Sequence, residues 1–226
     1  MIEEEETKNE ERKSFKLEVK ETSPKDPVGC LEVNLSKFVM ERLQSYIEEA
    51  KINPVNHNAC LAGNISKSLL MKDKDDWFFN SILEPLIGQF YESFPLYNNL
   101  PIFAEDAPFC LNKFWVNFQK ENEFNPLHNH SGVFSFVIWV KIPTEWREQH
   151  ALPISANSGC PYASNFVFYY ISMLGDLAER AYHLDRESEG MMLFFPAKLQ
   201  HCVYPFYNCA EERAVSYTHL TLPTKT

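Results

Sequence analysis

Glycine is scarce in this chain, with 7 among 226 residues. A phosphate-binding loop needs several glycines close together, and the sequence contains no such group. The six cysteines form no CxxC pair, so the spacing typical of zinc sites and of dithiol redox motifs is also absent. Nucleotide binding by a glycine-rich loop is therefore excluded, and small unpaired thiols are the preferred interpretation of the cysteines.

Long apolar and basic stretches are missing as well. No apolar run approaches the ~18 residues that a membrane span requires. The first residues are acidic where a secretory signal would be basic and then apolar. The net charge of −10 disfavours nucleic acid as a partner, because phosphate neutralisation needs clustered lysine and arginine. We therefore expect a cytoplasmic protein with reduced thiols, no membrane segment and no nucleic-acid partner.

Aromatic residues are what the chain has in quantity, with 18 Phe and 10 Tyr. Such residues favour strands and fill the interior of a protein. A length of 226 residues suits one substantial domain. We expect a disordered acidic tail over residues 1–14, a single domain over residues 15–214 and a tail of non-native sequence over residues 215–226. The final "VSYTHLTLPTKT" resembles translated sequencing-adapter read-through, so His219 is not counted as a ligand.

Hydrophobic periodicity divides the domain into a helical part before about residue 100 and a strand-rich part after about residue 109. The helices are expected over residues 37–49, after a capping Ser36, and over residues 75–94, where Pro85 would bend or divide the helix. Two short strands are expected before the helices, over residues 15–19 and 28–33. The later strands are expected at residues 113–120, 134–142, 166–173, 191–195 and 202–206. Helices followed by a run of strands suggest a β-sandwich or barrel with helices outside it.

Three histidines and one arginine have spacing that suggests metal chemistry. His128 and His130 are separated by one residue at the end of an expected strand, so both side chains point to the same side. His201 follows a strand and a proline turn, and Arg213 lies 12 residues further on (213 − 201). Three ligands on one face of a metal leave positions for a chelating co-substrate and dioxygen. A guanidinium can then bind the far carboxylate of that co-substrate.

Several motifs carry a resemblance to a known family. These are "LAGNISKS", "NPLHNHSG", "FSFVIWVKIP", "ASNFVFYY" and "FFPAKLQHCVYPFY". Between about residues 61 and 213 the chain resembles the 2-oxoglutarate- and iron(II)-dependent oxygenases. It looks most similar to the prolyl-hydroxylase-like members found in marine bacteriophages. The resemblance implies a mainly β fold with flanking helices, whose core is a double-stranded β-helix of the jelly-roll or cupin type. It also implies a host-cytoplasmic location if the chain is phage-encoded.

The family resemblance assigns roles to the spaced residues. His128 and His201 would take the two metal-histidine positions, and Arg213 would bind 2-oxoglutarate. The implied cofactors are iron(II) and 2-oxoglutarate as co-substrate, with ascorbate as a candidate reductant. The implied reaction hydroxylates a C–H bond of a small-molecule or peptide substrate, with a peptidyl proline as one candidate, and releases succinate and CO2. The sequence predicts neither the substrate nor the oligomeric state.

One position departs from the family pattern. The family has Asp or Glu two residues after the first histidine, where this chain has His130. An imidazole in place of a carboxylate leaves an iron site one charge more positive. Three histidines bind iron in other cupin-like oxygenases, so His130 is included among the predicted catalytic metal ligands. The alternative is that only one of His128 and His130 binds metal, while the other contacts substrate or co-substrate.

Other polar residues are weaker candidates for the site. Asn117 and Gln119 share a strand face with Trp115 and could bind the co-substrate, or they could satisfy buried backbone groups instead. Tyr204 could line the pocket, or it could belong to an aromatic core. His57, His150 and His183 are expected to be surface residues.

Two further interpretations of the whole chain stay open at this point. The first is a three-histidine dioxygenase of the cupin type that does not use 2-oxoglutarate. The second is a non-catalytic β-sandwich used in binding or virion assembly. Convergence of His128, His130 and His201 on one centre would favour an enzyme over the non-catalytic sandwich.

Overall fold

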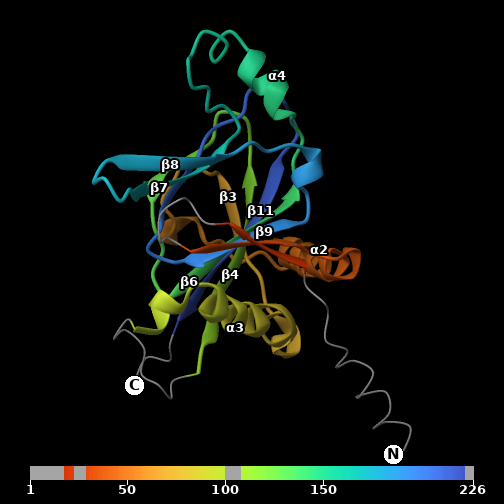
Figure 1. Cartoon of the computed structure of the whole chain (residues 1–226). Helices are drawn as coiled ribbons and strands as arrows, with labels where there is room; N and C mark the ends of the chain where they lie inside the picture. Colours follow the sequence, from red (N-terminus) through yellow and green to blue (C-terminus); the bar gives the residue numbers. More distant parts are fainter. Residues whose placement is uncertain (1–17, 23–28, 100–107, 222–226) are drawn as a thin grey trace, which may run out of the picture.

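The fold is known from a computed structural model that describes residues 18–22, 29–99 and 108–221 (Figure 1). The acidic tail expected over residues 1–14 lies outside this part of the chain. Within it, the strands form two antiparallel sheets. In chain order they are β1 (Glu18–Thr22), β2 (Cys30–Asn34), β3 (Lys67–Leu70), β4 (Cys110–Gln119), β5 (Asn125–His128), β6 (Phe134–Lys141), β7 (Phe166–Ile171), β8 (Leu177–Tyr182), β9 (Met191–Pro196), β10 (Gln200–Val203) and β11 (Arg213–Thr221).

The two sheets face each other as the layers of a jelly roll. The larger sheet has the order β1-β2-β9-β6-β11-β4-β3, and the smaller has the order β5-β10-β7-β8. From β4 to β11 the chain passes repeatedly between the sheets, which is the double-stranded β-helix that the sequence predicted. The early strands β1 and β2, near the two expected before the helices, extend the larger sheet at one edge, and β3, which was not expected, extends it at the other.

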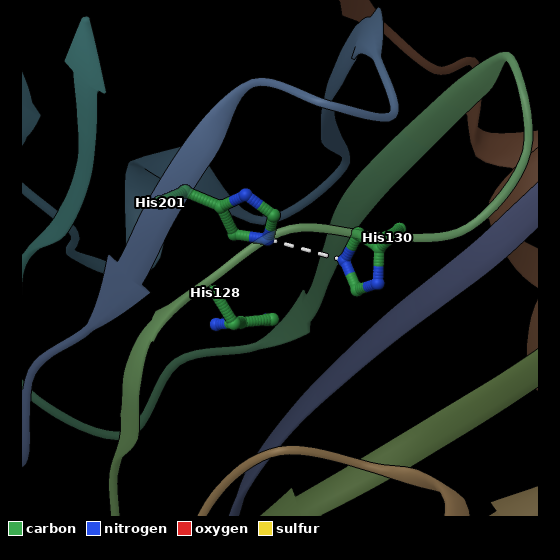
Figure 2. Close-up of side chains that lie close together, drawn as sticks. All are labelled: His128, His130 and His201. Carbon is green, nitrogen blue, oxygen red and sulfur yellow. Dashed lines mark hydrogen bonds between the residues drawn. The ribbon is translucent and has the colours of Figure 1, made fainter.

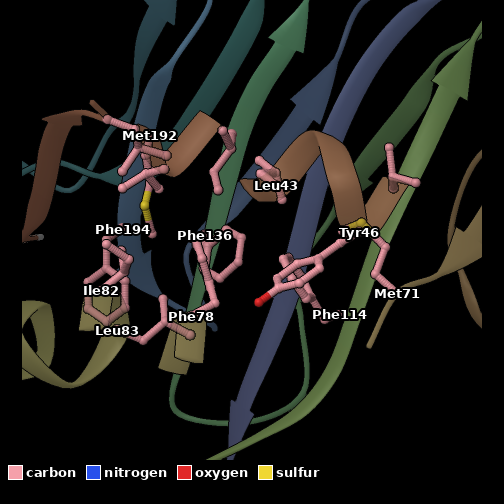
Figure 3. Close-up of a cluster of buried hydrophobic side chains, with 14 of the residues drawn as sticks. Leu43, Tyr46, Met71, Phe78, Ile82, Leu83, Phe114, Phe136, Met192 and Phe194 are labelled. Atoms are coloured by element: carbon pink, nitrogen blue, oxygen red, sulfur yellow. The ribbon is translucent and has the colours of Figure 1, made fainter. Parts of the chain in front are cut away.

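The larger sheet is buried on both faces. Alternate side chains of a strand point to opposite faces, so each central strand contributes apolar residues to both. On β4, Phe114 and Val116 pack toward the helices, while Trp115 packs between the sheets. The same alternation on β9 sends Phe194 to the helical side and Phe195 to the inner side. Figure 3 shows part of the helix-side cluster, which lies between this sheet and the two longer helices. The sheet therefore has one face for packing and one that is turned toward the predicted metal ligands.

The first of the two longer helices begins where the sequence predicts, whereas the second begins later than the expected residue 75. Helix α2 (Lys37–Ile52) has Ser36 as its N-cap, whose hydroxyl accepts a bond from the backbone N–H of Val39 at 3.4 Å. The second expected helix is interrupted, because a π-helical turn (Phe79–Leu83) precedes α3 (Glu84–Ser93). Pro85 lies in the first turn of α3, where its missing N–H removes no bond that a helix interior would need. The irregularity near Pro85 is thus a π-helical turn, and the backbone stays helical through Leu83 and Glu84.

A third helix, α4 (Trp146–Ala151), lies far from α2 and α3, at the top of Figure 1. No helix in the described part of the chain is both long and apolar enough to cross a membrane.

Residues 215–221 form the greater part of strand β11. This strand pairs with β4 on one side and with β6 on the other, and it buries Val215, Tyr217 and Leu220. The stretch was expected to be a non-native tail outside the domain. In the structure it lies in the interior of the larger sheet, because its alternating apolar residues match the two buried faces. Residues 222–226 lie outside the described part of the chain.

Candidate metal centre

The three histidines come together at one end of the smaller sheet. His128 ends β5 and His201 lies in β10, and these two residues are direct partners in the antiparallel pair of strands. His130 follows in the next loop, where its backbone N–H donates to the carbonyl of Ala197 at 2.8 Å. The pairing of two neighbouring strands and one backbone bond thus places three imidazoles side by side (Figure 2).

The distances between the imidazole nitrogens suit a shared metal ion. Nε2 of His130 and Nε2 of His201 are 3.1 Å apart. One ligand nitrogen from each of the three histidines lies within 4.8 Å of the others. Two nitrogens at roughly 2.1 Å from a metal and at right angles are about 3.0 Å apart. The separation of His130 and His201 therefore fits two ligands of a single ion.

Backbone carbonyls orient two of the three rings. Nδ1 of His128 lies 2.7 Å from the carbonyl oxygen of Pro126, and Nδ1 of His201 lies 2.9 Å from that of Leu199. A carbonyl oxygen only accepts, so each Nδ1 must carry the hydrogen, and each Nε2 keeps its lone pair. Such outer bonds are the usual way in which metal-binding histidines are held in one tautomer. The chain itself thus prepares His128 and His201 as Nε2 ligands.

Burial keeps these imidazoles neutral, which is the form that binds metal. His201 is fully buried, and burial together with the nearby His128 lowers its pKa to about 3. Burial also lowers the pKa of His128. The ring of His201 is flanked by Phe166 at 5.4 Å and Phe195 at 5.3 Å between centroids. This apolar wall excludes water from one side of the candidate centre.

In the metal-free protein, we expect acid to lower the free energy of unfolding. The unfolded chain binds a proton at His201 near a pKa of ~6.5, whereas the folded chain does so only near 3. Between these values the unfolded state holds more protons, so protonation favours unfolding, with about 2 kcal/mol lost from pH 7 to pH 5. Urea unfolding of the wild type and of His201→Gln at both pH values checks this. Equal pH dependence in the two proteins would contradict the assignment.

A cavity of about 130 Å³ opens beside the histidines. Two of them, His128 and His130, line it together with the inner faces of β4 and β11. Its other lining residues are Cys60, Leu61, Ala62, Trp115, Asn117, Asn125, Asn129, Ser131 and Tyr217. The lining contains amides and hydroxyls but neither a carboxylate nor a lysine or arginine. A neutral polar group of a ligand would therefore find hydrogen-bonding partners here without an opposing charge.

Arg213 begins β11, and its side chain is fully buried. Its guanidinium donates to the side-chain oxygen of Gln119 at 3.5 Å and to the hydroxyl of Ser164, and it lies over the ring of Phe206 at 4.9 Å. Its Nε has no hydrogen-bond partner within the described part of the chain. Among the described residues, no carboxylate lies within 4.0 Å of it. Burial lowers the pKa of Arg213 to about 10, so the side chain is still cationic at neutral pH.

A buried cation without an anion is costly for a protein to keep. The surroundings of Arg213 are neutral oxygens and one aromatic ring, which orient the guanidinium without balancing its charge. A ligand carboxylate would supply both the missing charge and the missing acceptor. Arg213 is therefore suited to bind an anionic group that enters the space between the sheets.

The two candidate amides have different surroundings. The side-chain oxygen of Asn117 accepts from the hydroxyl of Ser68 at 2.7 Å, and Asn117 lines the cavity beside the histidines. Gln119 is the strand partner of Arg213, and its Nε2 donates to the carbonyl of Glu123 at 2.6 Å. That bond turns the oxygen of Gln119 toward the guanidinium. Gln119 thus orients Arg213, while Asn117 is available to the cavity.

Of the two roles left open for Tyr204, its surroundings favour the aromatic one, since it does not line the cavity beside the histidines. Its hydroxyl lies 2.9 Å from that of Tyr169, and its ring stacks on Tyr162. It lines a separate hollow, which also contains Cys202. Tyr204 directly follows the end of β10, where the chain leaves the strand that carries His201.

Sequence reasoning missed several residues that surround the site. Ser164 and Thr144, whose hydroxyls are 3.2 Å apart, are buried next to Arg213 but carry no motif. Trp115 packs against His130, with ring centroids 5.8 Å apart. His57 was expected at the surface and is instead buried against Trp115, because its backbone joins Ser68 of β3. Alternation along β4 could have identified Trp115, whereas nothing in the local sequence marks Ser164.

Comparison with known proteins agrees with this architecture. Residues 113–218, slightly less than half of the chain, match the family model 2OG-FeII_Oxy_5, which describes 2OG-Fe(II) oxygenases. No curated protein matches the chain in sequence. A prolyl-4-hydroxylase from Pseudomonas putida is similar in structure, with a TM-score of 0.51 and 11% identity over 87% of this chain and 94% of that one.

Two further solved structures share the fold. OsALKBH1 has a TM-score of 0.54 and 9% identity, over 88% of this chain and 99% of that one. The non-heme alpha-ketoglutarate-dependent carbocyclase SnoK of nogalamycin biosynthesis has a TM-score of 0.52 and 10% identity, over 88% of this chain and 84% of that one. At these identities the likeness concerns the fold alone. It confirms the predicted double-stranded β-helix.

Proposed function

We propose that this chain is a 2-oxoglutarate- and iron(II)-dependent oxygenase, as the family match over residues 113–218 suggests, and that it hydroxylates a C–H bond of its substrate at an iron held by His128, His130 and His201. The observation that carries the proposal is the convergence of three imidazoles, of which those of His128 and His201 are oriented by backbone carbonyls and kept neutral by burial. Iron(II), when bound, supplies the activation of dioxygen that accompanies conversion of 2-oxoglutarate to succinate and CO2. The chain supplies position, charge and exclusion of water.

In this proposal Arg213 binds the far carboxylate of 2-oxoglutarate. Its guanidinium is buried and lacks an acidic partner among the described residues, so a dianionic co-substrate would neutralise it. Gln119 and Ser164 hold the guanidinium in one orientation. Three neutral ligands leave an iron(II) centre with two positive charges, and the chelating carboxylate of the same dianion would offset one of them. Both ends of the site thus favour a ligand with negative charge at each end.

The substrate is proposed from analogy rather than from geometry. One structural neighbour is a prolyl-4-hydroxylase, so a prolyl residue in a peptide is the first substrate to test. Substrate choice depends on loops and pockets rather than on the fold. The uncharged lining of the cavity suits the backbone amides of a peptide.

Succinate formation and oxygen uptake test the function. The metal-free chain is supplied with iron(II), with and without 2-oxoglutarate, ascorbate and a proline-rich peptide. We expect succinate only when iron(II) and 2-oxoglutarate are both present, with a higher rate when the peptide is a substrate. Oxygen consumption that needs iron(II) but not 2-oxoglutarate would favour the three-histidine cupin-type dioxygenase. Absence of iron binding would contradict the proposed centre and favour a non-catalytic role.

Replacing His130 tests whether all three histidines bind the metal. We expect His130→Ala to weaken iron(II) binding by more than the 10- to 100-fold that loss of an outer-shell partner costs. His130→Asp should keep iron binding and 2-oxoglutarate turnover, because a carboxylate at this position completes the common two-histidine, one-carboxylate set.

Leu127→Ala is the matched control for these variants. Leu127 is on the same strand as His128 but is 57% exposed and does not line the cavity. Equilibrium dialysis with iron(II) under anaerobic conditions measures the affinity of each protein. Unchanged affinity in His130→Ala would show that His130 is not a ligand.

A further inference from the structure

A second group of histidines lies away from the predicted iron ligands. His150 is on α4, and His183 directly follows β8. Between them is Asn165, a fully buried residue directly before β7. The side-chain oxygen of Asn165 is 3.2 Å from Nε2 of His150 and also 3.2 Å from Nδ1 of His183. Three segments far apart in the sequence thus bring two imidazole nitrogens and one amide oxygen to the same place.

These distances fit a coordination sphere. Ligand atoms at roughly 2.1 Å from a zinc-class ion are about 3.0 Å apart at a right angle and about 3.4 Å apart at the tetrahedral angle. Both nitrogen-to-oxygen distances in this group lie between those limits. They are also long for hydrogen bonds from imidazole N–H groups, which centre near 2.9–3.0 Å. The cluster therefore has the dimensions of a metal site as much as of a pair of hydrogen bonds.

The surrounding side chains hold the three groups in place. Asn165 donates from its amide nitrogen to the carbonyl of Pro161 at 3.4 Å, which turns its oxygen toward the histidines. Trp146 stacks on the ring of His183, with centroids 4.7 Å apart and planes 23° apart. The same indole contacts His150 at 5.3 Å. The site is therefore ordered before any ion binds, which lowers the entropic cost of binding.

We propose that His150, His183 and Asn165 form a second site for a divalent transition-metal ion of the zinc or nickel class. Imidazole is a preferred ligand of both metals, and an amide oxygen with water can complete the sphere. Bound metal would join α4 to the ends of β7 and β8. The positive charge of Arg147 opposes the binding of a cation here. Its guanidinium lies over the ring of Trp146 at 4.3 Å, and its charge contributes to lowering the pKa of His183.

Stoichiometry tests the proposal independently of the oxygenase centre. Metal-free protein is titrated with nickel(II) by calorimetry, since the exposed Cys60 and Cys160 would compete more strongly for zinc. We expect two equivalents in the wild type and one in His183→Ala. His201→Ala should also bind one equivalent, and the double variant none. His183 is exposed, so its replacement does not endanger folding; thermal unfolding of each variant verifies this.

Arg147→Ala serves as a second, opposite test. Removing a nearby positive charge should tighten nickel(II) binding at the second site, whereas a group held only by hydrogen bonds would bind no ion in either protein. One equivalent in the wild type that is unaffected by His183→Ala would overturn the second site and leave the oxygenase centre intact. Two equivalents of which His183→Ala removes one, with no loss in His201→Ala, would support the second site and contradict the first.

Discussion

Replacing Arg213 with methionine is expected to weaken 2-oxoglutarate binding by about 30-fold or more, because loss of one partner in a buried charged pair costs about 2–5 kcal/mol. The same change should stabilise the ligand-free protein by about 1–4 kcal/mol, because it removes a buried cation that has no anion among the described residues. A residue kept for binding at the expense of stability would show both effects. A residue kept only for structure would show neither the weaker 2-oxoglutarate binding nor the higher stability.

Two ligands separate the role of Arg213 from a general disturbance of the site. Binding to the iron(II)-loaded protein is measured by calorimetry without oxygen, using 2-oxoglutarate and 2-oxobutyrate. The second compound has the same chelating end but lacks the far carboxylate, so Arg213→Met should affect it little. Similar losses for both compounds would point to a distorted metal centre. Unchanged affinity for 2-oxoglutarate would exclude Arg213 as its anchor.

Replacing His201 with alanine is expected to abolish turnover and to remove tight iron(II) binding. Among the three predicted ligands His201 is the one that is fully buried, and its ring centroid lies 4.3 Å from that of His128 and 4.9 Å from that of His130, so its loss removes a nitrogen from the centre of contact with both. The variant should also lose its metal-dependent increase in melting temperature, since an ion stabilises only a state that binds it.

Cys202→Ser is the control for that experiment. Cys202 is next to His201 on β10 but points into the separate outer hollow, so its replacement tests the effect of altering the strand itself. Succinate formation and iron content are measured for both variants. Turnover that survives in His201→Ala would remove His201 from the proposed centre. Loss of activity in both variants with lowered stability would indicate strand damage instead.

The predicted metal ligands could be read from the sequence because each depends on local geometry. A spacing of two at the end of a strand predicts that His128 and His130 lie on one side, and a strand after a proline turn places His201. The environment of Arg213 could not be read, because Ser164 reaches it from the loop before β7. The direction of the Tyr204 side chain was missed. The expected strand over residues 202–206 did not include His201, so the alternation of side chains could not be counted from His201 to Tyr204.

The strands that escaped prediction include both edges of the smaller sheet, β5 and β8, and one edge of the larger sheet, β3. Strand β5 contains Pro126, which argues against a central strand but is tolerated at an edge. Strand β8 contains Glu179 and Arg180, and charges of this kind are common on edge strands, where they discourage pairing with other chains. Central strands such as β6 were recognised because burial on both faces makes them continuously apolar.

The position of β11 has a consequence for how the chain folds. Within the larger sheet, the group β1-β2-β9-β6 and the group β4-β3 are hydrogen-bonded to each other only through this strand. Each group can form from its own pairings, but neither completes a buried face until residues 213–221 insert between them. We therefore expect slow folding governed by distant contacts, with one late step that closes the sheet and delivers Arg213 to the interior at the same moment. Binding capacity for a ligand carboxylate would then appear only with the final folding step.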